Sequence, residues 1–412
     1  MTIAEKILAR ASGKRTVKPR ELVTAQIDVA MSHENADVVL RAFREIGIEK
    51  VWDPERIVLL FDHRIPADSE KTAATHQRIR NFVKEQGIKY FYDLKEGICH
   101  QILPEKGHSR PGEVMVGTDS HTTTHGAFGT FAAGIGATEM AGVWAMGELW
   151  FMVPESLKIE VSGHFPHYVS AKDLILSIIG RLGAAGADYK AVEFCGEAIS
   201  EMSIASRMVM TNLSMEMGAK VAFVVPDAKT IDYVKARTDK EFTASLPDED
   251  AQYARTMDIC VDDLEPMIAC PHAVDNVKPV RAVAGTKIDQ ALIGSCTNGR
   301  LEDIAVAAEI LDGKVVARDV RLLVIPASRE VYLRALEMGY IEILVKSGAV
   351  ILNPGCGPCL GAHQGLLAGG EVCISTTNRN FKGRMGSPES AVYLASPATV
   401  AQSAINGVIA AP

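Results

Sequence analysis

Short runs of consecutive apolar residues alternate along the chain with longer segments of helical periodicity. Because these runs are continuously apolar, they suit parallel strands that are buried on both faces. The clearest predicted strands lie within residues 57–63, 114–121, 220–227, 287–295, 320–328 and 349–355. Helices are predicted over residues 3–11, 301–311 and 329–348. This repeated order of strand and helix indicates an α/β fold.

Two breaks in the pattern divide the chain. Pro-Glu-Ser at residues 154–156 precedes a new strand-like segment, and a polar stretch with two prolines spans residues 271–279. We therefore predict three α/β domains with mainly parallel sheets, at residues 1–157, 158–276 and 277–412. A chain of 412 residues is long enough for two or three domains of ordinary size.

Polar side chains of catalytic type follow several predicted strands. Asp62 and His63 end one apolar run, and Asp119, Ser120 and His121 end another. In open α/β sheets, ligands bind beyond the carboxyl ends of the strands. We therefore expect side chains from separate strands to face one shared cleft.

Composition and charge argue against several classes of protein. The net charge of −8 and the pI of about 5.8 give no reason to expect general affinity for nucleic acid. No stretch approaches the ~18 consecutive apolar residues of a membrane span, and the first residues lack the apolar core of a signal peptide. We therefore expect a cytoplasmic protein without a membrane partner, in which the eight cysteines stay reduced.

Three of the cysteines are candidate metal ligands. Cys356 and Cys359 form a C-x-x-C pair in a loop rich in glycine and proline, and Cys296 lies between an apolar run and a predicted helix. A zinc site would need a fourth strong ligand, and the loop lacks the helix start of a thioredoxin-type redox pair. Three thiolates suit a [4Fe–4S] cluster with one iron left open. Spacing alone supports a structural or incidental pair equally well.

Four motifs carry a resemblance to a known family. They are GTDSHT at 117–122, GSCTNGR at 294–300, NPGCGPCLGAH at 353–363 and NRNFKGRMG at 378–386. In this order they resemble the aconitase superfamily, and more narrowly the large subunits of two-chain hydro-lyases such as 3-isopropylmalate dehydratase, homoaconitase and 2,3-dimethylmalate dehydratase. The resemblance covers nearly the whole chain. It implies one [4Fe–4S] cluster per subunit, held in a central cleft by Cys296, Cys356 and Cys359.

The resemblance also implies roles for the histidine-bearing motifs. His63, assisted by Asp62, would be the acid that protonates the hydroxyl leaving a hydroxy-acid substrate. Asp119 and His121, together with His100, would line the cluster pocket and organise bound water. Taken singly, each histidine is more often explained as a satisfied structural residue.

Further residues are assigned by the same resemblance. Glu193 matches a glutamate that contacts the water or hydroxyl at the cluster, although an ordinary structural carboxylate is the alternative. Arg379 and Arg384 match arginines that hold substrate carboxylates, for which the guanidinium fork is suited. A solvated basic loop is the simpler reading of these two arginines. Ser120 is a candidate substrate contact.

Two departures from the single-chain aconitases bear on the substrate and the partner. Ser32 and His33 occupy the region where those enzymes have a glutamine, which argues against citrate. The sequence ends at Pro412, shortly after the arginine motif. The resemblance therefore implies a separate small subunit that supplies the fourth domain, with its catalytic serine and the loop that selects the substrate.

Other classes of function fit less well. An aconitase-like regulator that binds RNA would need the fourth domain, and the negative charge also counts against it. An electron carrier would not explain the Asp–His and arginine groups around three cysteines. The glycine-rich stretch at 129–142 lacks the strand–turn–helix spacing of a dinucleotide fingerprint.

Overall fold

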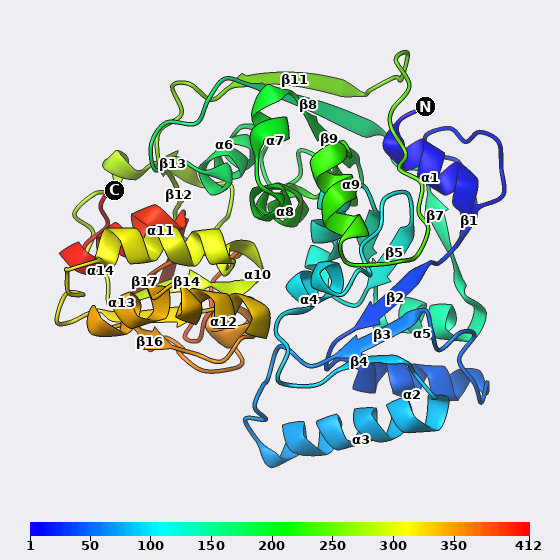
Figure 1. Ribbon diagram of the computed structural model, residues 1–412, viewed down its shortest axis with the longest axis horizontal. Coiled ribbons are helices and arrows are strands. Elements are labelled where there is room, and N and C mark those ends of the chain that lie inside the picture. Colours follow the sequence, from blue (N-terminus) through cyan, green and yellow to red (C-terminus); the bar gives the residue numbers. More distant parts are fainter.

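The computed structural model describes residues 1–412 and contains three main β-sheets, each accompanied by helices (Figure 1). Most strand pairs are parallel, which confirms the predicted α/β class. Figure 1 shows the first sheet, blue to cyan, and the third, yellow to red, as separate lobes. Green segments of the second sheet span the top of both lobes.

The first sheet has five parallel strands in the order β4-β3-β2-β5-β6. Every residue of the three central strands is buried, which explains their continuous apolar runs. The strands are β2 (Val29–Ser32), β3 (Ile57–Leu60), β4 (Tyr90–Tyr92), β5 (Val114–Gly117) and β6 (Phe131–Gly134). The helices are α2 (Ala36–Ile46), α3 (Glu70–Gln86), α4 (Cys99–Glu105), the 3₁₀ helix η1 (Ser120–Phe128) and α5 (Ala137–Met146).

An antiparallel ribbon and the first helix complete this lobe. Strand β1 (Leu22–Gln26) pairs with β7 (Glu148–Met152), and buried and exposed residues alternate along β1 because only one face is covered. Helix α1 (Ile3–Ala11) has the bounds predicted from its periodicity. Thr2 and Glu5 close its first turn as a capping box.

The second sheet has four parallel strands in the order β10-β9-β8-β11. Its strands are β8 (Ser156–Ser162), β9 (Ala191–Cys195), β10 (Val221–Val224) and β11 (Arg255–Cys260). Its helices are α6 (Ala171–Leu182), α7 (Glu197–Glu201), α8 (Ile204–Leu213), η2 (Ser214–Met217) and α9 (Ala228–Lys235). Helix α8 contacts η1 of the first lobe, where the Thr211 hydroxyl donates to the Thr124 carbonyl at 2.8 Å.

The third sheet has seven strands in the order β13-β12-β18-β17-β14-β15-β16. Its strands are β12 (Met267–Ala269), β13 (Val277–Pro279), β14 (Gln290–Gly294), β15 (Arg321–Ile325), β16 (Val350–Ile351), β17 (Val372–Ser375) and β18 (Ala391–Ala395). Its helices are η3 (Val280–Ala282), α10 (Ser295–Asn298), α11 (Leu301–Leu311), α12 (Arg329–Glu337), α13 (Tyr340–Lys346), η4 (Gly357–Leu360) and α14 (Pro397–Asn406). Strand β12 joins this sheet by antiparallel pairing, although it precedes the predicted division at residue 276.

One helix prediction in this lobe is wrong. Residues 329–348 form two helices, α12 and α13, and not one. Gly339 separates them with a φ of 76°, a left-handed conformation that glycine adopts without steric cost. The apolar periodicity runs through this turn, so the pattern alone does not reveal the break.

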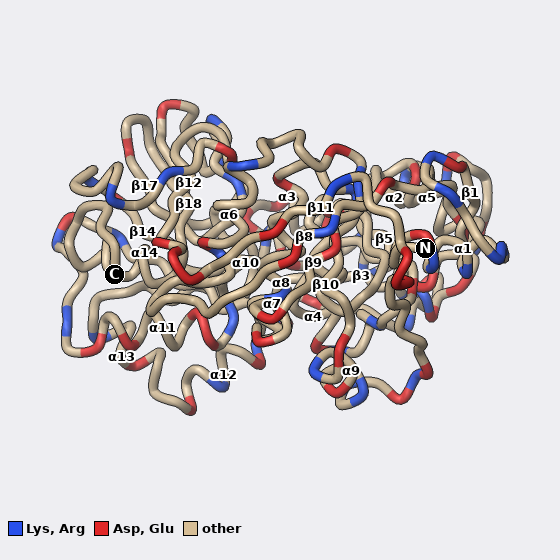
Figure 2. Tube along the Cα trace, turned by 90° about the horizontal axis from the view of Figure 1, so that it is seen from above, with Lys and Arg blue, Asp and Glu red and all other residues tan.

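The surface carries both signs of charge. Figure 2 shows lysine and arginine interspersed with aspartate and glutamate along the trace. None of the helices combines the length and apolar character that crossing a bilayer requires.

Candidate active site

One cavity collects side chains that follow strands of the first and third sheets. It lies where β3, β5 and β14 end, as expected for the carboxyl ends of parallel strands. Eight of the twelve predicted site residues line it: His63, His100, Asp119, His121, Cys296, Cys356, Cys359 and Arg384. Residues from distant parts of the sequence therefore meet in one place.

The three predicted cysteine ligands are buried and unpaired by disulfides. Cys296 lies in the first turn of α10, directly after Ser295, whose φ of 71° redirects the chain as β14 ends. Cys356 and Cys359 share one turn, in which the Cys359 N–H donates to the Cys356 carbonyl at 3.2 Å. Burial raises the pKa of Cys296 to about 11, so without a metal this group is a neutral thiol.

The surroundings of Cys296 fit a sulfur-ligated metal cluster. The side-chain amides of Asn212 and Asn378 donate to its Sγ at 3.3 and 3.4 Å. Such donors stabilise the negative charge that a thiolate carries when it binds metal. Three buried thiols around one cavity are soft ligands of the kind that iron–sulfur clusters require. Neither asparagine was predicted from the sequence.

Asp62 and His63 form a buried pair directly after β3. Asp62 Oδ1 lies 2.5 Å from His63 Nδ1, and Asp62 Oδ2 accepts the Cys99 N–H at 2.8 Å. Burial lowers the pKa of His63, but Asp62 and the neighbouring Cys356 outweigh it and raise this pKa well above its usual value. The imidazole is therefore held in its protonated form, as a general acid requires.

Asp119 lies at the centre of three histidines. Its Oδ1 is 2.9 Å from His100 Nε2 and accepts the backbone N–H of His121 at 2.7 Å. Its Oδ2 is 3.6 Å from His63 Nε2. Burial would raise the pKa of Asp119, but His100 and His121 lower it well below its usual value. The cavity thus contains a fixed negative charge between potential proton donors.

The structure corrects the expectation for Glu193. This residue lies in β9, where its carboxylate accepts the Ile3 N–H and the Tyr253 hydroxyl, each at 2.7 Å. It therefore anchors the N-terminal segment and does not reach the cavity.

A different glutamate, Glu216 in η2, contacts the predicted site residues, although it does not itself line the cavity. Its Oε1 lies 2.7 Å from His121 Nε2 and accepts Arg379 Nε–H at 2.8 Å. The available sequence signal was weak, because Asn212 and Glu216 are two polar residues one helical turn apart in a methionine-rich segment.

The two predicted arginines have different surroundings. Arg379 is held by Glu216, whereas Arg384 lines the cavity and its buried Nε has no hydrogen-bond partner. A buried guanidinium nitrogen without a partner is a free donor for an anionic ligand. Ser120 lies beside this cavity and lines a neighbouring one with Lys220.

Together, the α/β fold and this cavity bring three buried thiols, Asp–His groups and an arginine into one place, as in an enzyme with a candidate metal-cluster site. A model of the aconitase family (aconitate hydratase) matches residues 5–407. The chain belongs to the aconitase family, whose members use an iron–sulfur cluster.

Curated relatives match the chain over its full length. A probable 3-isopropylmalate dehydratase large subunit of Methanothermobacter thermautotrophicus is 58% identical, with 100% of this chain and 99% of the relative covered. A 3-isopropylmalate dehydratase large subunit of Methanopyrus kandleri is 56% identical, with 100% and 98% covered. A probable methanogen homoaconitase large subunit of M. thermautotrophicus is 54% identical, with 100% and 97% covered.

Proposed function

We propose that this chain is the large subunit of a two-chain hydro-lyase that isomerises a hydroxy acid by dehydration and rehydration. The preferred substrate class is 3-isopropylmalate, after the names of the relatives at 58% and 56% identity. One [4Fe–4S] cluster would be held by Cys296, Cys356 and Cys359. The observation that carries the proposal is the meeting of three buried thiols with His63 and Arg384 in one cavity.

Dehydration of a hydroxy acid needs help at the leaving hydroxyl, because hydroxide is a poor leaving group. When bound, the cluster supplies Lewis-acid chemistry that weakens the bond between carbon and this hydroxyl. His63 would donate a proton to the departing oxygen from Nε2, since its Nδ1 is occupied by Asp62. The reverse transfer would activate water for rehydration.

The remaining groups would orient substrate and water. Arg384 would bind a substrate carboxylate through its unpartnered guanidinium, and Arg379 would bind a second carboxylate while Glu216 fixes its orientation. Asp119 and its histidine partners would hold the water. Binding of two carboxylates would place the reacting carbon beside His63. This fixed orientation would contribute to the rate enhancement by proximity.

A small subunit would complete the catalyst. The relatives are named large subunits, and this chain covers 97–99% of the three described above. We propose that the small subunit supplies the serine that removes the carbon-bound proton and the loop that recognises the substrate's side chain. All eight cysteines are free, which fits a reducing compartment, and we propose the cytoplasm.

Homocitrate is the second candidate substrate, because a relative at 54% identity is named a homoaconitase. The test is anaerobic co-expression with the candidate small subunit, followed by turnover of isopropylmalate, homocitrate, citrate and dimethylmalate under the same conditions. Preference for isopropylmalate supports the proposal, and preference for homocitrate changes the substrate but keeps the chemistry. Absence of turnover on all four acids, with the cluster intact, contradicts the proposed reaction.

A matched pair of histidine variants tests the acid. His63→Asn should abolish turnover while iron and sulfide content remain near the wild-type level. His164→Asn is the control, because the His164 side chain is 72% exposed and lies away from the cavity. Equal activity in the two variants would contradict the role of His63.

A further inference from the structure

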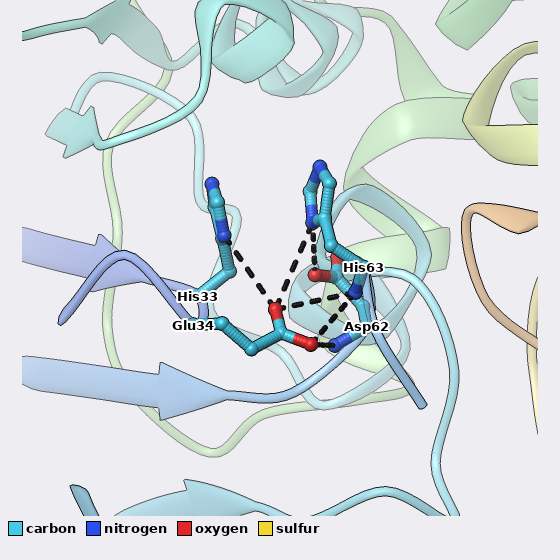
Figure 3. Close-up of side chains that lie close together, drawn as sticks. All are labelled: His33, Glu34, Asp62 and His63. Atoms are coloured by element: carbon cyan, nitrogen blue, oxygen red, sulfur yellow. Dashed lines mark hydrogen bonds and ion pairs between the residues drawn. The ribbon is translucent and has the colours of Figure 1, made fainter. Parts of the chain in front are cut away.

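Glu34 lies beside the turn that carries His63. It follows β2, and the turn at residues 62–64 follows β3. Because β2 and β3 are parallel neighbours, with Ser32 opposite Leu59, both segments emerge at the same edge of the sheet. Figure 3 shows the Glu34 carboxylate directed at the backbone of Asp62 and His63.

The Glu34 carboxylate accepts hydrogen bonds from three successive backbone N–H groups. Its Oε1 accepts from Asp62 at 3.1 Å, from His63 at 2.9 Å and from Arg64 at 2.9 Å. Its Oε2 also accepts from His63, at 3.2 Å. Successive N–H groups that converge on one anion form a strong backbone site, and Glu34 is buried, so water competes little.

The same carboxylate lies next to the imidazole of His63. Glu34 Oε2 is 3.8 Å from His63 Nδ1 and 3.6 Å from His33 Nδ1. The His33 ring stacks on the His63 ring with centroids 4.0 Å apart and 23° between their planes (Figure 3). The ring of His63 is therefore confined on one side by His33, while its Nδ1 is held by Asp62.

The anchored turn also touches the cysteine loop. The Asp62 carbonyl accepts the Cys356 N–H at 2.9 Å. A side chain at Gly355 would place its Cβ 3.0 Å from the same carbonyl, so the two backbones are in close contact. A shift of residues 62–64 would therefore move His63 relative to the loop that carries two of the thiols.

We propose that Glu34 is a positioning residue that anchors residues 62–64 and so fixes the place of His63 in the cavity. The effect of Glu34 on turnover rests on the proposed role of His63 as the acid, whereas the anchoring of residues 62–64 does not. The carboxylates and imidazoles of His33, Glu34, Asp62 and His63 also lie within 4.8 Å of one another, which is close enough for a cation. Hydrogen bonding explains the close approach of these four side chains better than a cation does. A cation would displace the Asp62–His63 hydrogen bond and compete with three N–H donors for Glu34.

Amide hydrogen exchange of the anaerobic holo-subunit tests the anchoring directly. Glu34→Ala removes the acceptor and should speed exchange at residues 62–64 by roughly tenfold or more, because the turn can then open locally. Glu34→Gln keeps one acceptor oxygen and should give a smaller increase in the exchange rate. This second variant also tests the anchoring if the alanine variant does not fold.

Asp173→Asn is the matched control. Asp173 is a buried carboxylate that accepts backbone N–H groups from Ser170 and Met267, each at 2.9 Å, and it does not line the cavity. Its replacement should alter exchange near these partners and leave residues 62–64 unchanged. Equal exchange at 62–64 in wild type, Glu34→Ala and Glu34→Gln would overturn the inference.

Turnover with the small subunit tests the consequence for His63. Per bound cluster, Glu34→Ala should lower kcat by roughly 10²-fold, because a misplacement of about 1 Å has that effect. KM should change by less than about threefold, since the arginines that bind the substrate are untouched. Loosened exchange with unchanged kcat would overturn the positioning role. Wild-type enzyme inactive on every acid would contradict the proposed function instead, while the exchange comparison would still decide the anchoring.

Discussion

Replacing Glu216 by glutamine removes a negative charge that two cationic side chains share inside the protein. Glu216 Oε1 lies 2.7 Å from His121 Nε2 and 2.8 Å from Arg379 Nε, and only 3% of the Glu216 side chain is exposed. Burial raises the pKa of Glu216, but its hydrogen bond to His121 and the charges of His121 and Arg379 outweigh this and lower it. The carboxylate is therefore ionised at neutral pH.

The cost of the substitution follows from these two contacts. A hydrogen bond to a charged group contributes about 1.5–3 kcal/mol, and because both contacts are made by Oε1, a glutamine oxygen can keep them only as weaker bonds to a neutral acceptor. Breaking a buried ion pair and leaving the partner charge unpaired costs about 3–5 kcal/mol, although His121 can relieve part of this by losing its proton. We expect Glu216→Gln to lower the free energy of unfolding by about 2–4 kcal/mol.

Urea unfolding of the cluster-free chain measures this change without a contribution from metal binding. Glu265→Gln is the control, because Glu265 also accepts two charge-assisted hydrogen bonds, both from Arg281, but on the exposed surface, where their loss should leave stability nearly unchanged. In the assembled enzyme, Glu216→Gln should also raise KM, since Arg379 loses its fixed orientation. A stability change within about 0.5 kcal/mol, together with an unchanged KM, would refute the shared-carboxylate interpretation.

Three further changes have defined outcomes. Cys359→Ser should prevent full incorporation of iron and sulfide on anaerobic reconstitution, and a stoichiometric cluster in this variant would contradict the ligand assignment. Burial raises the pKa of Asp227, but the Arg207 guanidinium outweighs it and lowers this pKa to about 2. Asp227→Asn should therefore cost about 1–2 kcal/mol at pH 7, and the difference should shrink as the pH falls from 4 to 2; a pH-independent difference would refute this. Burial lowers the pKa of His108 to about 3, so the imidazole stays neutral in the folded chain while it becomes protonated in the unfolded chain below pH 6.5. The free energy of unfolding should therefore be full above pH 6.5 and lower by about 2 kcal/mol at pH 5. His108→Gln should remove that part of the pH dependence of urea unfolding, and an unchanged slope would contradict it.

Much of the site was predictable because its residues directly follow strongly patterned strands. The apolar run that becomes β3 places Asp62 and His63 at a strand end, and the run that becomes β14 does the same for Cys296. Ligands bind beyond the carboxyl ends of parallel strands, so the local pattern predicted a cleft, whereas the packing of the first sheet against the third makes it a shared one. The glycines and the proline around the C-x-x-C pair predicted the turn that carries it.

Two residues that contact the site side chains without lining the cavity were not predictable in this way. Asn212 and Glu216 come from α8 and η2, and nothing in their local sequence distinguishes them from an ordinary helix surface. The prediction for Glu193 failed for a different reason, because it rested on a match to a family glutamate and not on the residue's own surroundings. Its partners are Ile3 and Tyr253, which are remote in sequence.

The sequence by itself determined the α/β class, most strands, and the cysteines, histidines and arginines of the candidate site. These depend on periodicity and on short motifs, which are local properties of the chain. Only the tertiary structure decided which glutamate contacts His121, which amides face Cys296, and that Glu34 accepts the backbone N–H groups of the turn that carries His63. Each of these depends on contacts between segments far apart in the sequence, and such contacts follow from how the sheets and helices pack.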